Sequence, residues 1–142
     1  MATKKAQAKP RREPMSRVDT AWLRMCRPTN PMMITGVLMF DEPMTLDKLR
    51  QLVRKRFLAN PRILQKAVDT PAGASWVEDE NFDLDWHVRI SALPGRSDRK
   101  SEKKALERFA GQMASSPLDK SKPLWQFHLV ERYQGGSALV AR

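Results

Sequence analysis

The sequence predicts an α/β fold of the α+β type, in which helices pack on a mixed β-sheet. Amphipathic segments with helical spacing alternate along the chain with short runs rich in apolar and aromatic residues. The residues between the last two runs, Gln134-Gly135-Gly136-Ser137, are typical of a hairpin turn. A chain that mixes helices with hairpin-linked strands is expected to form a mixed sheet covered by helices.

The first elements are a helix and a strand. Ser16 can cap a helix in which Val18, Trp22 and Leu23 share one side, and the two prolines in residues 27–31 end it. Residues 32–40 are apolar on both faces. Such a run is typical of a central strand that is covered on both sides.

The middle of the chain predicts a helix and a β-hairpin. Thr45 can cap a helix over residues 46–59, whose leucines repeat at helical spacing. Residues 63–68 and 75–77 are expected to form two strands joined by the Pro71-Ala72-Gly73 turn. An acidic loop, an extended segment over residues 84–90 and a polar loop over 96–103 are expected to follow.

The last third predicts a helix and two strands. Residues 104–114 place Ala105, Leu106, Phe109, Ala110 and Met113 on one helical face. Residues 124–132 alternate as a strand does, with Trp125, Phe127 and Leu129 on one side and Gln126, His128 and Val130 on the other. The next strand starts at Ser137 and the chain stops inside it, so we expect residues 15–142 to be the N-terminal portion of a domain that is incomplete at its C-terminus.

Charge and composition limit the possible partners. The formal net charge is +10, and residues 1–14, with five basic side chains and one acidic one, are expected to be a basic flexible tail; Met15 is an alternative start. A basic surface favours nucleic acid, anionic membrane or a phosphate-bearing cofactor. The single cysteine, Cys26, indicates an intracellular protein, and no signal peptide or membrane-spanning run is present in the sequence.

The residues offer few candidates for chemistry. The Gly135-Gly136 pair lacks the remainder of a phosphate-binding loop, and two histidines 41 positions apart do not predict a metal site. His87 is expected to be a surface or core histidine. His128 lies on the polar side of its strand, where it could line a channel wall. The sequence predicts no assembled nucleophile and base.

An ordered set of motifs resembles one enzyme family. Ser16-Arg17-Val18-Asp19 with Trp22-Leu23, then Trp76-Val77-Glu78-Asp79 with Phe82-Asp83-Leu84 and His87-Val88, are similar to segments at the N-terminus of bacterial wax ester synthase/diacylglycerol acyltransferases. Asn30-Pro31-Met32, Leu93-Pro94, Pro117-Leu118-Asp119 and Pro123-Leu124-Trp125 follow at matching spacing. The resemblance runs from Met15 to the end of the sequence, with Trp22 in place of the family's usual phenylalanine.

The resemblance implies a fold and an activity. The fold would be the N-terminal part of a two-lobed, CoA-dependent acyltransferase-like architecture, cut within a strand. In the family that strand, here beginning Ala138-Leu139-Val140, leads into a His-His-x-x-x-Asp-Gly motif whose second histidine is the general base. Residues 1–142 contain no such motif, so no catalytic residue is expected in this chain; the motif is expected just after Arg142, and the chain alone is expected to be inactive.

The resemblance also implies substrates and a location. The intact protein would transfer a fatty acyl group from acyl-CoA, its co-substrate, to diacylglycerol or a long-chain alcohol. No bound cofactor or metal and no specific nucleic acid is expected. The protein would be cytoplasmic and peripheral to anionic membrane or lipid inclusions. The resemblance places Pro123, Leu124 and Trp125 beside the substrate channel; the alternative is a strand-entry turn with a buried tryptophan.

Two other functions are compatible with the sequence. One is a condensation-type or polyketide-associated acyltransferase domain, against which the Trp76–Asp79 segment argues. The other is a non-catalytic basic module that binds nucleic acid or membrane. Only the net charge supports this module. The interleaved aromatic and basic residues that are typical of nucleic-acid binding are absent from the sequence.

Overall fold

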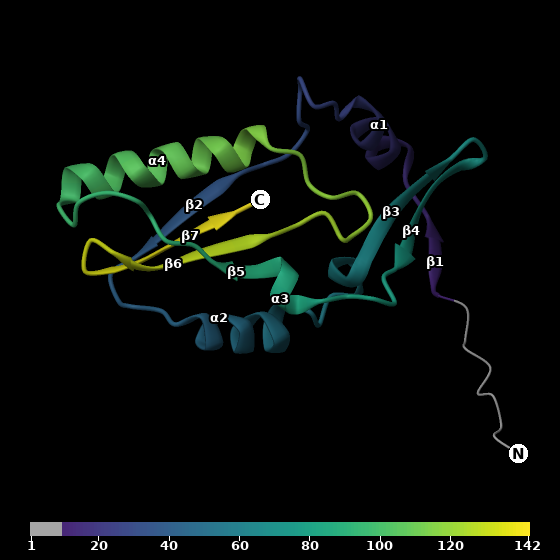
Figure 1. Cartoon of the computed structure of the whole chain (residues 1–142). Coiled ribbons are helices and arrows are strands. Elements are labelled where there is room, and N and C mark those ends of the chain that lie inside the picture. The colour runs from purple at the N-terminus through teal and green to yellow at the C-terminus, as the bar shows by residue number, and fades with distance from the viewer. Residues whose placement is uncertain (1–9) are drawn as a thin grey trace, which may run out of the picture.

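Two β-sheets organise the chain in the computed structural model, which describes residues 10–142 (Figure 1). The larger sheet has the order β2-β7-β6-β5, and the smaller has the order β1-β4-β3. Figure 1 shows α4 on one face of the larger sheet and α2 on the other, with α1 beside the smaller sheet. The expected mixed sheet with packed helices is confirmed.

The larger sheet contains both kinds of pairing. Its strands are β2 (Gly36–Phe40), β5 (Val88–Ile90), β6 (Phe127–Tyr133) and β7 (Gly136–Ala141). The pairs β2–β7 and β6–β7 are antiparallel, whereas β5 runs parallel to β6. The predicted hairpin joins β6 to β7, where Gln134 (φ 50°) and Gly135 (φ 86°) both take positive φ, as a tight two-residue hairpin turn requires.

Helix α4 (Arg99–Ser115) covers one face of this sheet. Its buried Leu106 packs with a cluster from β6 and β7, namely Val130, Tyr133, Ala138 and Val140. The helix was predicted from residue 104, with a polar loop over 96–103. It begins earlier because Asp98 caps it, with a carboxylate oxygen 3.0 Å from the amide nitrogen of Ser101.

Helix α2 (Leu46–Leu52) and a π-helical turn (Val53–Phe57) cover the opposite face, as predicted for residues 46–59. The core on this side consists of Leu49, Val53, Leu84, Val88, Trp125, Leu129 and Leu139. The segment expected to be extended over 84–90 instead begins as one helical turn, α3 (Leu84–His87). Asp83 caps this turn by accepting from the amide of Asp85, and the strand starts only afterwards.

Strand β2 differs from its prediction in length and place. It lies at the edge of the sheet and begins at Gly36, opposite Ala141, the last residue of β7. The prediction of a central, covered strand over 32–40 was wrong, because apolar content does not reveal how many neighbours a strand has. Val37, Leu38 and Met39 are 41%, 47% and 66% exposed.

The smaller sheet consists of β1 (Arg12–Pro14), β4 (Gly73–Glu78) and β3 (Gln65–Thr70), all antiparallel. The predicted β3–β4 hairpin is confirmed. Of the expected flexible tail over 1–14, residues 1–9 lie outside the described part, but Arg12–Pro14 form a strand.

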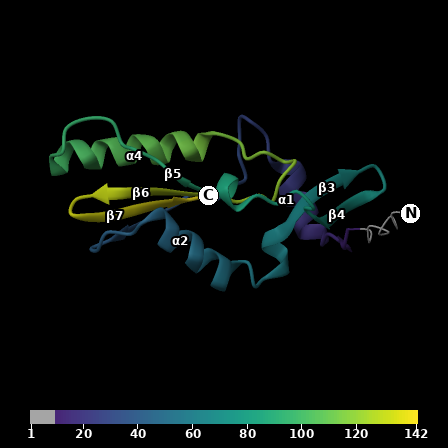
Figure 2. The same cartoon turned by 60° about the horizontal axis from the view of Figure 1, so that its bottom comes forward.

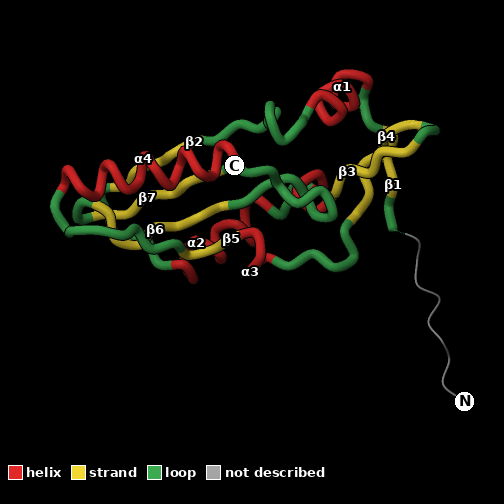
Figure 3. Tube along the Cα trace, turned by 45° about the horizontal axis from the view of Figure 1, so that its top comes forward, coloured by secondary structure: helices red, strands yellow, loops and turns green. Residues whose placement is uncertain are grey.

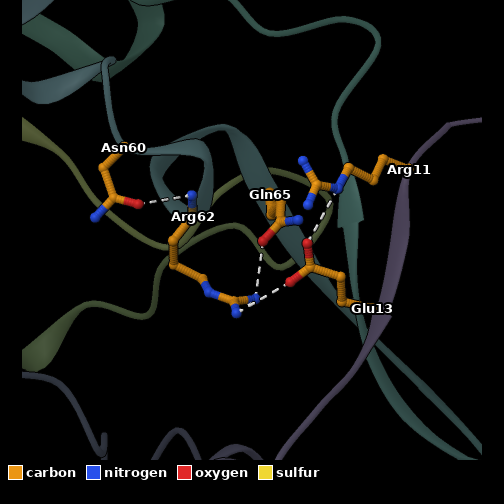
Figure 4. Close-up of polar contacts among 5 residues, drawn as sticks. All are labelled: Arg11, Glu13, Asn60, Arg62 and Gln65. Carbon is orange, nitrogen blue, oxygen red and sulfur yellow. Dashed lines mark hydrogen bonds and ion pairs between the residues drawn. The ribbon is translucent and has the colours of Figure 1, made fainter.

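Side-chain contacts explain why this segment is ordered (Figure 4). Glu13 accepts from Arg62, on a 3₁₀ turn (Pro61–Leu64), across 3.4 Å and pairs with Arg11 across 3.2 Å. Arg62 also donates to Gln65 at 2.8 Å, and Asn60 caps the turn by accepting from the amide of Arg62. These contacts fix the basic segment on the sheet, so its charge does not by itself make it a tail.

Helix α1 (Arg17–Met25) lies next to the smaller sheet (Figure 3). Ser16 caps it as predicted, with Oγ 3.0 Å from the amide nitrogen of Asp19. None of its side chains is buried. The segment after α1 runs from the smaller sheet to the edge of the larger one. Within residues 10–142, every helix is too short or too polar to cross a membrane.

Candidate functional site

An apolar groove of about 600 Å³ opens between the larger sheet and α1. Figure 2 shows the C-terminal end of β7 directed toward α1 and the smaller sheet. The volume is in the range of pockets that hold small molecules. The lining residues come from widely separated segments and include Trp22, Leu23, Met32, Ile34, Phe57, Trp76, Leu118, Leu124, Trp125, Phe127 and Ala141.

Aromatic rings form one wall of the groove. Trp125 is 8% exposed and meets Phe57 edge-on at a centroid distance of 5.1 Å. Phe127 lies 5.3 Å from both rings. The indole Nε1 of Trp125 donates to the carbonyl oxygen of Ile63 at 2.9 Å, which satisfies its polar atom and fixes the ring.

The facing wall comes from α1 and the segment that follows it. Trp22 on α1 is 54% exposed, and Ile34 is 90% exposed. Both line the groove together with Met32 and Met33. Large apolar side chains that border a groove and remain accessible are suited to contact an apolar ligand.

The loop over residues 117–124 forms a third side through Pro117, Leu118, Lys120 and Leu124. Asp119 stabilises this loop by accepting from both the amide and the hydroxyl of Ser121, at 2.9 and 2.7 Å. These hydrogen bonds hold the pKa of Asp119 below its usual value. The ionised carboxylate of Asp119 therefore serves to hold the loop together.

Charged side chains in the lining are few. Asp19, Lys120 and Arg142 are its three charged residues within the described part of the chain. An apolar groove with so few charged residues suits a mostly apolar ligand.

His87 belongs to the core beneath the groove. Its ring lies between Phe82, at a centroid distance of 4.8 Å, and Trp125, at 4.3 Å. Its Nδ1 donates to the carbonyl oxygen of Trp125 at 2.7 Å, and the side chain is fully buried. Burial lowers the pKa of His87, which keeps the imidazole neutral.

His128 is buried between β6 and α4. Its ring meets Phe109 edge-on at 5.6 Å, and its Nδ1 lies 3.3 Å from the hydroxyl of Ser91. Burial, followed by the positive charges of Arg142 and Arg89, lowers the pKa of His128 to about 4. The ring is therefore uncharged at neutral pH.

The structure separates the four residues singled out from the sequence. Leu124 and Trp125 line the groove. Pro123 is fully buried, and His128 is 7% exposed on the side of β6 that faces α4. In the described part of the chain, the lining of this groove includes neither Pro123 nor His128. Their part in a channel remains a prediction.

Several groove residues were not identified as site residues from the sequence. Trp22, Ile34, Phe57 and Trp76 lie far apart along the chain, and tertiary packing alone brings them together. The motif similarity marks Trp22 and Trp76 but gives no indication that they share a groove. Between residues 10 and 142, no three His, Cys, Asp or Glu side chains are grouped so as to hold a metal ion.

Comparisons with known sequences all point to one family. The model of the wax ester synthase/diacylglycerol acyltransferase catalytic domain matches residues 15–141. A probable diacylglycerol O-acyltransferase of Mycobacterium tuberculosis is 31% identical over 123 residues, which cover 82% of this chain and 44% of the relative. A putative diacylglycerol O-acyltransferase of the same species is 35% identical over 119 residues, which cover 74% of this chain and 22% of the relative. The chain thus spans less than half the length of these relatives.

Comparison with solved structures agrees with this family. The wax ester synthase/diacylglycerol acyltransferase from Marinobacter aquaeolei VT8 superposes with a TM-score of 0.71 at 26% identity, covering 90% of this chain and 32% of that one. The tallysomycin biosynthesis protein TlmII superposes with a TM-score of 0.64 at 20% identity, covering 92% and 30%. The first condensation domain of the CDA synthetase reaches 0.53 at 19% identity, covering 75% and 27%. The last two likenesses show the fold alone.

Proposed function

Because the chain belongs to the wax ester synthase/diacylglycerol acyltransferase family, we propose that it forms the N-terminal part of an O-acyltransferase. The intact enzyme would transfer a fatty acyl group from acyl-CoA to diacylglycerol or a long-chain alcohol. Residues 15–142 would then be the N-terminal portion of its acyltransferase domain, incomplete at the C-terminal side. In this proposal the groove binds an apolar chain of one of the two substrates.

The observation that carries the proposal is that residues 141 and 142 lie at the groove. Ala141 and Arg142 line the apolar groove beside Leu124 and Trp125. A residue that follows Arg142 would therefore start next to a site suited to a hydrocarbon chain. This juxtaposition supports a catalytic group placed shortly after Arg142.

The proposed chemistry uses a histidine in the segment after Arg142. A neutral imidazole there would take the proton of the acceptor hydroxyl while the oxygen attacks the thioester carbonyl carbon. The carbon–sulfur bond breaks as the new ester forms, and the CoA thiolate leaves and takes up a proton. The described residues would contribute the groove wall, which positions the hydrocarbon and excludes water.

His87 and His128 do not suit the role of this base. His87 already donates through Nδ1 to Trp125 and is fully buried. His128 has a pKa of about 4, well below neutral, and lies against α4. We propose accordingly that residues 1–142 by themselves have no transferase activity.

We also propose a peripheral association with anionic membrane or lipid inclusions. The excess of 26 Lys and Arg over 16 Asp and Glu favours anionic surfaces and the phosphates of CoA. Exposed Val18, Trp22 and Met25 on α1 are suited to an apolar–water interface. Both substrates of the proposed reaction carry long apolar chains, so such a location would bring enzyme and substrate together.

The test begins with the coding sequence past the Arg142 codon and the protein that it encodes. A His-His-x-x-x-Asp-Gly motif within a few residues is expected, together with palmitoyl transfer from palmitoyl-CoA to dioleoylglycerol or hexadecanol. Leu124→Arg should abolish transfer by placing a charge in the groove, whereas exposed Arg108→Met on α4 should leave it unchanged. A stop codon directly after Arg142 with a stable product, or robust turnover by residues 1–142, would contradict the proposal.

A condensation-type acyltransferase is the second candidate, favoured by the fold likeness to condensation domains. That reaction would take its acyl group from a carrier-protein thioester. Offering the whole protein a palmitoyl-loaded carrier protein and palmitoyl-CoA side by side separates the two. A preference for the carrier-bound acyl group would favour this candidate.

A further inference from the structure

The side chain of Arg142 joins three elements at the end of β7. Its Nη1 donates to the carbonyl oxygens of Met113 at 3.1 Å and Ser116 at 2.9 Å, at the C-terminal end of α4. Its Nη2 and Nε donate to Oε1 of Gln126 at 2.7 and 3.2 Å. One guanidinium thus makes four hydrogen bonds.

The helix end needs such a donor. The last carbonyl groups of a helix have no partner within it, and the negative end of its dipole favours a cation. The last turn of α4 has no basic residue of its own. Arg142 supplies both the donors and the charge from a different element.

Gln126 is a buried partner, 3% exposed. Its backbone exchanges two hydrogen bonds with Arg142: the amide of Gln126 donates at 2.8 Å and the amide of Arg142 at 2.9 Å. Its side-chain amide also donates to the carbonyl oxygen of Trp86 at 3.3 Å. The Gln126–Arg142 pair, just beyond the ends of β6 and β7, is therefore held by backbone and side chain together.

These contacts are made where the backbone reaches the groove. Arg142 lines the groove, whereas within the described residues Gln126 is not part of that lining. The guanidinium is directed to the C-terminal end of α4 and to Gln126 by all four of its hydrogen bonds. Its donors are used for protein contacts and not for a ligand.

We infer that Arg142 is a positioning residue, which, with Gln126, fixes the backbone at residue 142 and so the place of the catalytic histidine proposed to follow it. This inference rests on the proposed function. A fixed backbone there matters because a displacement of about 1 Å in a reacting group can cost on the order of 100-fold in rate.

The test uses the whole protein, with palmitoyl-CoA and hexadecanol as substrates. Arg142→Met should lower kcat by about 100-fold with little change in KM for palmitoyl-CoA. Gln126→Leu should have a similar effect, although it is outside the groove lining, and the double variant should be no worse than either single one. Arg108→Met on the exposed face of α4 is the matched control and should keep full activity.

Arg142→Lys separates positioning from contact with substrate. Lysine keeps the charge, but its single nitrogen cannot replace the planar fork that reaches Gln126 and both carbonyls. Positioning therefore predicts a kcat close to that of Arg142→Met. Recovery of full kcat by lysine, or a rise in KM without a fall in kcat, would show that Arg142 acts on the substrate and would overturn the inference.

Hydrogen exchange distinguishes this inference from the proposed function. In the whole protein, Arg142→Met and Gln126→Leu should each speed amide exchange at Ser116, Gln126 and Arg142. If the wild-type protein transfers no acyl group, the proposed function fails, and the exchange result alone decides whether Arg142 fixes the backbone at residues 126 and 142. Unchanged exchange at these amides would overturn the inference whatever the activity.

Discussion

The Nδ1 atom of His87 lies 2.7 Å from the carbonyl oxygen of Trp125, and the two rings stack at a centroid distance of 4.3 Å. A carbonyl oxygen only accepts, so the histidine donates. Phe82 covers the other face of the imidazole at 4.8 Å. The turn that leads into β6 is thus fixed to α3, and Trp125 is held between the core and the groove.

Trp125→Phe should destabilise the chain by about 2–4 kcal/mol, from lost burial and from the unpaired carbonyl of Ile63. Urea unfolding of the chain measures this change. The control is Trp86→Phe, whose ring meets Arg89 and Lys122 on its faces and is only half-buried. It should cost about 1 kcal/mol or less. Equal losses in the two variants would contradict the anchoring role of Trp125.

The low pKa of His128 predicts a loss of stability in mild acid. The folded pKa of about 4 lies below the ordinary value of 6.5, so the unfolded chain binds the proton more readily. The stability that depends on a neutral His128 is fully present above pH 6.5 and is lost as the pH falls toward 4. It amounts to roughly 3 kcal/mol over that interval.

His128→Gln removes this titration while it keeps a polar side chain. The unfolding free energy of the variant should fall less between pH 6.5 and 4.5 than that of the wild type, as measured by urea unfolding at several pH values. The carboxylates titrate alike in both proteins, so they cancel in the comparison. Parallel pH profiles would show that His128 is protonated in the folded state as readily as in the unfolded one.

Local signals predicted α1, α4 and the β6–β7 hairpin well. Ser16 caps α1 through its own side chain, and the Gln134-Gly135 turn needs positive φ at both positions. Asp98 shows the limit of such signals: it caps α4, yet the polar residues after it are typical of a loop. Periodicity locates a helix more reliably than its first turn.

The candidate site was less predictable because its geometry is tertiary. The motif similarity marked Pro123, Leu124 and Trp125, of which the last two line the groove. The polar side of the predicted strand marked His128, which packs on Phe109 instead. Alternation along β6 assigns faces, but it does not say which face meets a groove and which meets a helix. The edge position of β2 likewise depends on strand order, which hydrophobic content does not encode.

Gly136 should tolerate no side chain. A Cβ at this position would collide with the backbone carbonyl of Phe40 and lie 2.8 Å from the carbonyl carbon of Asp41. Backbone atoms cannot rotate away, so β2 and β7 would have to separate. We expect Gly136→Ala to destabilise the chain by about 3 kcal/mol or more.

The control for this variant is Gly111→Ala. Gly111 lies within α4, and its added Cβ would meet nothing within 4 Å. Alanine is the better helix former, so this variant should gain about 0.5–1 kcal/mol. Thermal unfolding of both variants gives opposite shifts if the β2–β7 approach is as close as described. A neutral Gly136→Ala would mean that β2 is not held against the start of β7.

Arg24 and Asp69 join α1 to the smaller sheet through two hydrogen bonds, at 3.0 and 2.9 Å. The Arg24 hydrogen bond holds the pKa of Asp69 below its usual range. Since no side chain of α1 is buried, this exposed pair should matter to how firmly the helix docks. Arg24→Met should therefore speed amide exchange across α1, and so should high salt or a pH low enough to protonate Asp69. Arg17→Met, at an exposed position of the same helix, should leave amide exchange unchanged. Equal acceleration of exchange by both variants would mean that the overall positive charge of α1, and not the Arg24–Asp69 pair, holds the helix beside the groove.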